Sequence, residues 1–359
     1  MENKVENKMK KVELLKKVGS MQQVAHVRPI QFVEGRGKGV SGYDIKNGDL
    51  RFQVFGDKCL DIADFSYKGV NLSFIAKQGL IGRMDYDTHG LEGVRSIMGG
   101  LLFTCGLENT CSPCEEEGKH YPLHGRIRSA PGEHLASDER WEGDVYKLSV
   151  SGQMREAELF GKNLKLTRTI ETHYGEKTVK LTDVIENEGF NPEPMMVMYH
   201  FNLGYPLLDE GAQVILPTKK VTPRDEAAKK DAHLWNVVEA PVLNEPERVY
   251  LHELADNTEG NTFAALVNRD LNLGLKISYN KRHLPYFVQW KTFANSDYAM
   301  GLEPTNSGVH GRVGEGDNVH LLEPFAREIN EIIITVIDGE KEIEELMIEA
   351  NGLTKATAL

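Results

Sequence analysis

The feature that most constrains the fold is an alternation of apolar and polar residues with a period of two. Residues 50–55 (LRFQVF) and 60–65 (LDIADF) alternate on either side of a Gly-Asp-Lys turn, which predicts a β-hairpin that residues 70–75 extend into a meander. The pattern returns in short segments at 145–150, 164–170, 178–185, 263–267, 273–279, 286–290 and 332–337. Helical periodicity is scarce. The sequence therefore predicts an all-β fold, a large antiparallel β-sandwich.

Long connections separate these segments without a shift in composition that would divide the chain. Residues 77–98, 106–140 and 217–247 are expected to be mostly irregular, with a short helix near 225–230. We predict a charged N-terminal extension at 1–23, a single sandwich domain at 24–340, and a C-terminal helix or tail at 341–359. A chain of 359 residues is long for one domain, but large all-β folds reach such lengths.

Charge and composition exclude several classes of partner. Lys and Arg total 42 against 54 Asp and Glu, and the net charge of -12 repels nucleic-acid phosphates and anionic membrane surfaces. The chain has no apolar run of about eighteen residues, and its charged start lacks the apolar segment of a signal peptide. The four cysteines are consistent with a reducing compartment. We therefore expect a cytoplasmic protein that binds neither nucleic acid nor membrane.

Three of the cysteines are close in sequence. Cys105, Cys111 and Cys114, with His120 and His124 nearby, have the ligand types of a zinc site. However, structural zinc sites are usually built from two closely spaced doublets, and only Cys111 and Cys114 form one. We therefore favour ordinary loop and core thiols and predict no metal.

Glu303 is the first candidate for a catalytic base. The apolar residues 298–302 predict a short buried strand, which Pro304 is expected to end because proline cannot donate to a sheet ladder. A carboxylate at such a strand end would face a cleft. The alternative is a solvated glutamate at a strand terminus.

Two histidines complete the candidate set. His124 precedes Gly125, which allows a sharp turn that would expose the imidazole; the alternative is a solvated loop histidine. His200 lies near the end of the apolar run 195–201, where a buried imidazole needs a partner. The alternative is a core histidine bonded to backbone. Together with Glu303 they offer the base and acid that interconversion of sugar anomers requires. The base removes the proton of the C1 hydroxyl while the acid protonates the ring oxygen, and no cofactor is needed.

At these residues the chain resembles the galactose mutarotase-like superfamily, and most of all its poorly characterised aldose 1-epimerase branch. The resemblance runs from about Val40 to Ile337 and rests on residues 58–62 (KCLDI), 99–107 (GGLLFTCGL), 123–126 (LHGR), 199–204 (YHFNLG) and 301–304 (GLEP). It implies a β-supersandwich with an open sugar cleft. It also implies Glu303 as the base, His200 as the acid at the ring oxygen, and His124 as a residue that binds or polarises the sugar.

The chain departs from the family pattern at the acid. In characterised mutarotases this histidine stands four residues before an asparagine, whereas His200 stands two before Asn202 and Met198 occupies the family position. Side chains alternate along a strand, so Met198 and His200 are expected to share a face. The imidazole would then reach the cleft one pleat along, and the substrate would sit differently.

Further residues are candidates for sugar binding. Asn202 is one, and Trp290 with Gln289 offers another, since a flat indole suits the C–H face of a sugar; a core tryptophan is the alternative. Arg126 and Arg312 each follow a His-Gly pair and could bind the carboxylate or phosphate of an acidic or phosphorylated sugar, as could Arg83 and Arg95; surface charge is the alternative.

Two other functions remain open. One is a carbohydrate-binding protein without turnover. The other is a sugar isomerase or lyase that uses the same carboxylate on a carbon-bound proton. The partner is expected to be a small-molecule sugar, and a homodimer is compatible with the sequence although no segment indicates one.

Overall fold

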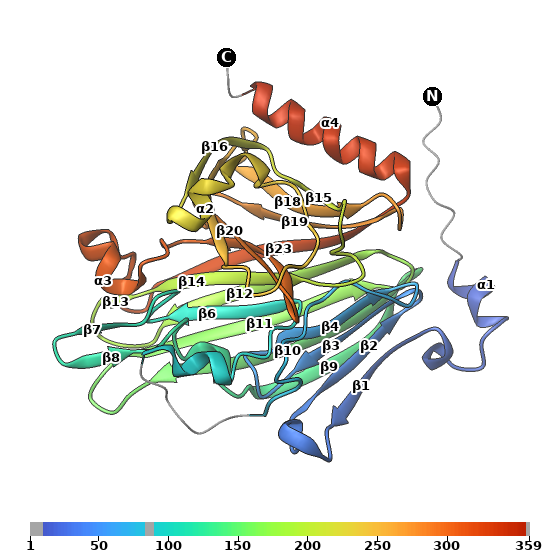
Figure 1. Cartoon of the computed structure of the whole chain (residues 1–359). Coiled ribbons are helices and arrows are strands. Elements are labelled where there is room, and N and C mark those ends of the chain that lie inside the picture. The colour runs from blue at the N-terminus through green and yellow to red at the C-terminus, as the bar shows by residue number, and fades with distance from the viewer. Residues whose placement is uncertain (1–9, 83–89, 357–359) are drawn as a thin grey trace.

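The structure, a computed structural model, describes residues 10–82 and 90–356. Its strands form three large antiparallel sheets (Figure 1). The first sheet contains β1 (Ala25–Gln31), β2 (Ser41–Asn47), β3 (Leu50–Phe55), β4 (Asp61–Tyr67) and β5 (Val70–Asn71), in this order. The second has the order β15 (Gln213–Ile215), β18 (Asn261–Asn268), β19 (Leu273–Asn280), β23 (Arg327–Asp338), β12 (Thr178–Asn187), β11 (Asn163–His173), β10 (Val145–Ala157) and β9 (Glu133–Glu142).

The third sheet carries the candidate site. Its order is β16 (Thr218–Pro223), β17 (Arg248–Leu254), β20 (Tyr286–Ala294), β21 (Asp297–Thr305), β14 (Met196–Leu203) and β6 (Leu102–Leu107). Two short ladders pair β7 (Cys114–Glu116) with β8 (Lys119–Tyr121), and β13 (Glu193–Pro194) with β22 (Leu321–Leu322). The α-helices are α1 (Lys11–Leu15), α2 (Glu226–Lys230), α3 (Gly311–Glu315) and α4 (Glu340–Ala356).

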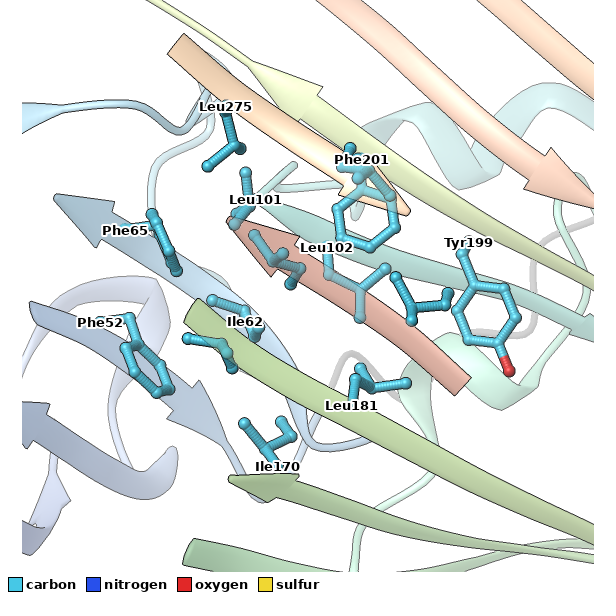
Figure 2. Packing of buried hydrophobic residues seen from close by; sticks show 14 of the residues in the cluster. Phe52, Ile62, Phe65, Leu101, Leu102, Ile170, Leu181, Tyr199, Phe201 and Leu275 are labelled. Carbon is cyan, nitrogen blue, oxygen red and sulfur yellow. The ribbon is translucent and has the colours of Figure 1, made fainter. Parts of the chain in front are cut away.

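One large cluster of buried apolar side chains joins the three sheets. It includes Phe52 and Phe65 of the first sheet, Ile170 of the second and Phe201 of the third, packed together as Figure 2 shows. The eight-stranded sheet is covered on its other face by α4, whose Ile343 and Leu346 join a smaller apolar cluster with residues of β15, β18 and β23. No helix in the described ranges is both long and apolar enough to cross a bilayer. The prediction of a large antiparallel β-sandwich is confirmed.

Most predicted elements are present, and several boundaries differ. The hairpin at 50–65, the strands of the second sheet, the short helix near 225–230 and the terminal helix are all found. The third strand of the predicted meander is only Val70–Asn71. The region 106–140 was expected to be irregular and in fact contains β9, an edge strand with one neighbour, whose residues are exposed or half-buried and therefore show little alternation. The division into extension, single domain and tail stays a prediction.

A buried ionic cluster lies on the reverse side of the strands that carry the candidate site. Arg168 of β11 is fully buried and donates to Asp183 at 2.8 and 2.7 Å, to Asp61 at 2.6 Å and to Thr104 at 3.0 Å. The hydroxyl of Tyr199 donates to Asp183 at 2.9 Å. Since Thr104 and Tyr199 belong to β6 and β14, the cluster ties the third sheet to the second.

Candidate functional site

A cleft of about 760 Å³ opens on the face of the third sheet that points away from the core. Its floor comes from alternate residues of neighbouring strands. His200 pairs with Phe103 across β14 and β6, and Glu303 pairs with Val288 across β21 and β20. These side chains therefore form a row across four strands.

Strand register explains why His200 meets Glu303. Phe201 pairs with Leu302 and Asn202 with Gly301, so the register of β14 and β21 sets His200 opposite Glu303. Residues directly opposite on one face of an antiparallel pair lie within side-chain reach. The Nε2 atom of His200 is 3.0 Å from the Oε1 atom of Glu303, although the two are not aligned as a hydrogen bond.

The strand that carries Glu303 does not end at Pro304, and that prediction is wrong. β21 continues to Thr305, and Pro304 pairs with Phe287 of β20. The ladder between β21 and β14 pairs Leu302 and Thr305 and skips Pro304, which lies between them. The proline thus occupies a gap in the β14 ladder, where no backbone donor is required. Glu303 consequently lies inside a central strand.

Glu303 is buried in surroundings that disfavour its charge. Its exposed fraction is 2%, and its Oε1 atom has no hydrogen-bond partner among the described residues. Burial raises the pKa of the Glu303 carboxyl well above its ordinary value, and the charge of Glu247 adds to this while Arg224 opposes it. The carboxyl therefore favours its protonated form.

Both histidines favour the neutral form. Burial lowers the pKa of His200 to about 4, and the side chain of Asn202 opposes this shift. Burial also lowers the pKa of His124 well below its ordinary value, with contributions from His200 and Arg128. The Nδ1 atoms of both rings are buried without a hydrogen-bond partner in the described structure. Each of these nitrogens is thus a buried polar atom that the described protein groups leave unsatisfied.

His124 reaches the cleft from the loop that follows β8. Its backbone has a φ of 60°, and the next residue, Gly125, has a φ of 70°. A Cβ on Gly125 would overlap the carbonyl oxygens of Gly106 and Asn109, so only glycine fits this turn. The imidazole packs edge to face against His200, with ring centroids 5.6 Å apart, and against Phe103 at 5.7 Å.

Trp290 and Asn202 also line the cleft, in the row beside that of Glu303. Asn202 pairs with Gly301, which pairs in turn with Trp290. The Trp290 ring stands 5.5 Å from the His200 ring, and its Nε1 donates to Glu247 at 2.8 Å. The amide of Asn202 donates to the backbone carbonyls of Gly100 and His200, both at 3.1 Å.

Met198 shares the face of His200, as the alternation along β14 predicts, but other residues cover it and it does not line the cleft. It pairs with Thr305 rather than with Glu303, and its sulfur is 3.7 Å from that of Cys111. The side chain is fully buried in an apolar cluster with Phe103. The residue that faces the carboxylate is therefore His200, at the offset position.

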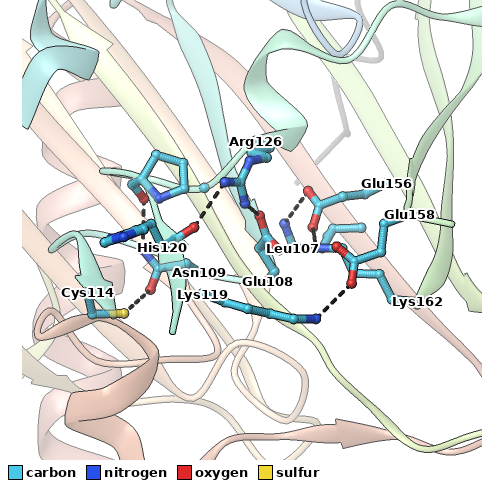
Figure 3. A network of polar contacts seen from close by, with 12 residues as sticks. Leu107, Glu108, Asn109, Cys114, Lys119, His120, Arg126, Glu156, Glu158 and Lys162 are labelled. Atoms are coloured by element: carbon cyan, nitrogen blue, oxygen red, sulfur yellow. Dashed lines mark hydrogen bonds and ion pairs between the residues drawn. The ribbon is translucent and has the colours of Figure 1, made fainter. Parts of the chain in front are cut away.

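Three other predicted sugar-binding residues do not line the cleft. Gln289 points to the opposite face of β20 from Trp290, where it is fully buried against His252 at 3.0 Å. Arg126 is directed toward Glu108 and donates to the carbonyl of His120 at 3.0 Å (Figure 3). Arg312 donates to Glu116 at 2.6 Å and stacks over Tyr121. The placement of all three corrects the expectation that they face the sugar, because other protein groups hold them elsewhere.

The structure places the remaining candidates except Arg83. Arg95 pairs with Glu92, 3.0 Å away, and Arg83 lies outside the described residues. Cys105 is fully buried and the Cys114 thiol lies 3.6 Å from the Asn109 side chain. Within 10–82 and 90–356, three or more His, Cys, Asp or Glu side chains nowhere gather in a way that would hold a metal.

The charged rim of the cleft was not predicted from the sequence. Arg224 donates to Glu247 at 2.9 Å, and Lys77 pairs with Asp297, 2.6 Å away. Glu245 also lines the rim. These residues are charged positions in polar connections or near a strand end, which in a single sequence look like solvated surface.

Comparison with known proteins was consistent with this architecture. Residues 37–336 match a family described as Domain of unknown function (DUF4432). The comparison with curated proteins found no match.

Solved structures resemble the chain over most of its length. A proposed aldose 1-epimerase from Klebsiella pneumoniae superposes with a TM-score of 0.86 at 21% identity, covering 91% of this chain and 87% of the other. A galactose mutarotase-like protein from Clostridium acetobutylicum gives a TM-score of 0.61 at 13% identity, covering 88% and 99%. Galactose 1-epimerase from Lactobacillus acidophilus gives 0.57 at 13%, covering 88% and 100%. The chain thus has the β-sandwich fold of the galactose mutarotase-like proteins.

Proposed function

We propose that this chain, which belongs to the family described as Domain of unknown function (DUF4432), interconverts the anomers of a reducing sugar. One observation carries the proposal. The Oε1 atom of Glu303 and the Nδ1 atoms of His200 and His124 are buried at the cleft without hydrogen-bond partners in the described structure. Buried polar groups are normally satisfied, so three such atoms at one cleft call for a ligand rich in hydroxyls. The aldose 1-epimerases among the structural neighbours support the same reaction class.

Glu303 and His200 form the proton-exchanging pair. Since burial raises the pKa of Glu303 and lowers that of His200, their shared proton rests on the carboxyl. Ring opening then transfers this proton to the ring oxygen while the His200 imidazole accepts the proton of the C1 hydroxyl. This proposal reverses the roles expected from the sequence, in which Glu303 is the base and His200 is the acid at the ring oxygen. The bond between C1 and the ring oxygen breaks and an aldehyde forms.

Ring closure reverses the two transfers. The aldehyde group rotates, the C5 hydroxyl oxygen attacks its other face, the carboxylate accepts the hydroxyl proton, and the imidazolium protonates the carbonyl oxygen. Both residues return to their starting states, so no cofactor is consumed. Each residue is acid in one direction and base in the other. His124 binds a sugar hydroxyl through Nδ1, and Trp290 provides an apolar surface for the ring.

The cleft favours an uncharged sugar. Among the described residues that line it, the two cations, Lys77 and Arg224, already pair with Asp297 and with Glu247. Glu245 and Glu247 add negative charge, and Arg126 and Arg312 are held elsewhere. A phosphate or carboxylate on the sugar would therefore meet mostly acidic groups. This narrows the expected substrate, a free, acidic or phosphorylated sugar, to a neutral sugar.

Anomer exchange measured across a panel of neutral aldoses tests the proposal. Saturation-transfer NMR between the two anomeric protons should show exchange well above the spontaneous rate for at least one sugar. Calorimetric binding without faster exchange would instead indicate a carbohydrate-binding protein. Deuterium incorporated from solvent at carbon would indicate an isomerase or lyase, because anomer exchange moves only oxygen-bound protons.

A further inference from the structure

The cleft continues along the strands well beyond Glu303 and His200. Alternate residues of β20 face it, namely Val288, Trp290, Thr292 and Ala294. Across the register Val288 pairs with Glu303 and Ala294 pairs with Asp297, which also lines the cleft. The floor therefore extends over the six residues of β21 that separate Glu303 from Asp297. At about 3.3 Å per residue this is a length of roughly 20 Å.

The other end of the cleft is closed beside His200. Met198, two residues before His200 on the same face of β14, is fully buried. The Cys111 sulfur lies 3.7 Å from the Met198 sulfur, and Val309 packs in the same apolar cluster. Since Cys111 and Val309 also line the cleft, they form its end wall. The two proposed proton-exchanging residues thus stand near the closed end, and the length along the strands extends from them toward Asp297.

One sugar ring occupies less than half of this length. A pyranose ring, built from bonds of about 1.5 Å, spans roughly 5–6 Å between the oxygens on C1 and C4. For the proposed exchange, C1 and the ring oxygen must reach Glu303 and His200, so the ring lies beside Trp290 in the next row. The positions of Thr292 and Asp297 then lie beyond it. The cleft volume of about 760 Å³ is likewise in the range that holds a drug-sized ligand.

Phe74 lines the cleft in the part beyond Trp290. Its backbone N–H donates to the carbonyl of Asn202 at 3.1 Å, which ties it to the end of β14. It lies against Gly204, where an added Cβ would be only 3.1 Å from the Phe74 Cβ. An aromatic ring offers an apolar surface to the C–H face of a sugar. Phe74 can therefore serve a second ring as Trp290 serves the first.

The far end of the cleft carries an ion pair. The Lys77 Nζ atom is 2.6 Å from the Oδ2 atom of Asp297, and both side chains are partly exposed. Together they present hydrogen-bond donors and acceptors with no net charge. Such a pair suits the hydroxyls of a neutral sugar better than a free anion or cation.

We propose that the cleft binds a neutral reducing oligosaccharide, with its reducing ring at Glu303 and His200 and its second ring at Phe74 and Thr292. This inference rests on the proposed anomer exchange, which decides the end of the cleft that holds C1. The second ring is attached through a hydroxyl away from C1, because C1 must carry a free hydroxyl. A third ring would reach Lys77 and Asp297.

Calorimetry on the full chain compares each neutral aldose of the panel with its disaccharides. Each disaccharide carries the same aldose at the reducing end and a second hexose on O3, O4 or O6. For at least one linkage the disaccharide should bind roughly tenfold more tightly than the aldose, because the second ring adds an aromatic contact and further hydrogen bonds. Saturation-transfer NMR on the same pair should reach half-maximal exchange at a correspondingly lower concentration of the disaccharide.

Two variants locate the second ring. Phe74→Ala should lower the ratio of disaccharide affinity to aldose affinity by roughly three- to tenfold, since it removes the aromatic surface. Phe190→Ala, at an exposed phenylalanine between β12 and β13, is the matched control and should keep the ratio. A ratio of affinities does not depend on the fraction of protein that is folded, so a loss of stability in Phe74→Ala does not change it.

Two results would overturn the inference. One is equal affinity for every aldose and its disaccharides, a comparison that needs no variant. The other is an unchanged affinity ratio in Phe74→Ala. Exchange of aldoses with equal affinities would remove the second ring and leave the proposed function standing. Tighter binding of a disaccharide without faster exchange would support the extended site and contradict the anomer exchange.

Discussion

The Oε1 atom of Glu303 lies 3.0 Å from the Nε2 atom of His200 because the two residues stand opposite each other on neighbouring strands. Their closeness follows from the register of β14 and β21 and needs no loop to hold it. Both groups are buried, and in a medium of low dielectric the pair favours the state in which neither carries a charge. We therefore expect the proton of the pair to rest on the carboxyl before the proposed sugar binds.

Glu303→Gln should stabilise the protein at neutral pH. In the unfolded chain a glutamate ionises near pH 4.3, whereas folding holds the Glu303 carboxyl in its protonated form to higher pH. Between these two pKa values the folded state binds more protons, so its stability falls as pH rises. Glutamine does not titrate. The variant should match the natural protein below about pH 4 and gain up to roughly 1.4 kcal/mol per pH unit above it.

Urea unfolding of both proteins from pH 4 to pH 8 measures this difference. Glu344→Gln, at an exposed residue of α4, is the matched control and should show no such trend. The same Glu303→Gln protein should lose anomer exchange by about 10²–10⁴-fold, the usual contribution of a general acid or base. A variant that is less stable at every pH would show that the Glu303 carboxyl is not held protonated.

Gly301→Ala should disturb the catalytic pair without a change of charge. A Cβ at this position would overlap the Oε1 atom of Glu303 and would lie 3.0 Å from the Cβ of Trp290 and 3.2 Å from the Cε1 of His200. The carboxyl must then turn away from the imidazole. We expect overpacking to cost about 1–3 kcal/mol and anomer exchange to fall by more than roughly tenfold.

The control for this variant is Gly352→Ala. Gly352 lies within α4, and a Cβ there would meet nothing within 4 Å. Alanine should therefore stabilise the helix by about 0.5–1 kcal/mol and leave exchange unchanged. Full activity in Gly301→Ala would mean that catalysis does not require the contact between Glu303 and His200.

Local pattern predicted the sandwich, because period-two alternation reports directly on buried faces. It also singled out Glu303 and His200, which the structure brings together and whose catalytic roles stay a proposal. It misjudged β9, an edge strand whose side chains are largely exposed on both faces. It also ended β21 at Pro304. Proline normally stops a strand, but a sequence does not reveal where the neighbouring strand leaves a gap in the ladder, and Pro304 occupies such a gap. The alternation along β14 was enough to predict that His200 could replace Met198.

Residues whose roles depend on long-range contacts were not predictable. Arg126 and Arg312 looked suited to anions, but Glu108 and Glu116 hold them outside the cleft. Gln289 was predicted to bind sugar together with Trp290 because the two residues are adjacent in sequence. The alternation of side chains along β20 instead places them on opposite faces of the strand. Glu247 belongs to a polar connection and was not predicted as a site residue; its contact with Trp290 is visible only in the structure.

Tryptophan fluorescence should report sugar binding through a single residue. Of the 3 tryptophans, Trp290 lines the cleft, Trp141 packs on Tyr146 in the second sheet, and Trp235 packs on His252. A bound sugar should therefore change emission from Trp290 alone. We expect the change to disappear in Trp290→Phe and to persist in Trp235→Phe, and titration with the best sugar of the panel measures it. Persistence of the signal in Trp290→Phe would place the sugar elsewhere.

A phosphate on the sugar should weaken binding. The rim carries Glu245, Glu247 and Asp297, and the two cations in its described part, Lys77 and Arg224, are already paired. We expect a sugar 6-phosphate to bind at least about tenfold more weakly than the free sugar, a difference of about 1.4 kcal/mol. The penalty should shrink as salt screens the rim. Arg312→Gln should leave both affinities unchanged. Tighter binding of the phosphate ester by calorimetry would contradict the neutral-substrate assignment.

Tyr199→Phe tests whether the buried ionic cluster supports the fold or also tunes the cleft. Tyr199 and His200 point to opposite faces of β14, and the Tyr199 hydroxyl donates to Asp183 rather than to any cleft residue. Removing it should cost about 1–3 kcal/mol of unfolding free energy, because Arg168 still holds Asp183 through two bonds. Arg168→Met should cost more, about 3–5 kcal/mol, since it leaves two buried carboxylates without their cation. Urea unfolding measures both costs, and sugar affinity of Tyr199→Phe should stay within about twofold, or roughly 0.4 kcal/mol. A larger loss of affinity with unchanged stability would show that the cluster sets the position of His200.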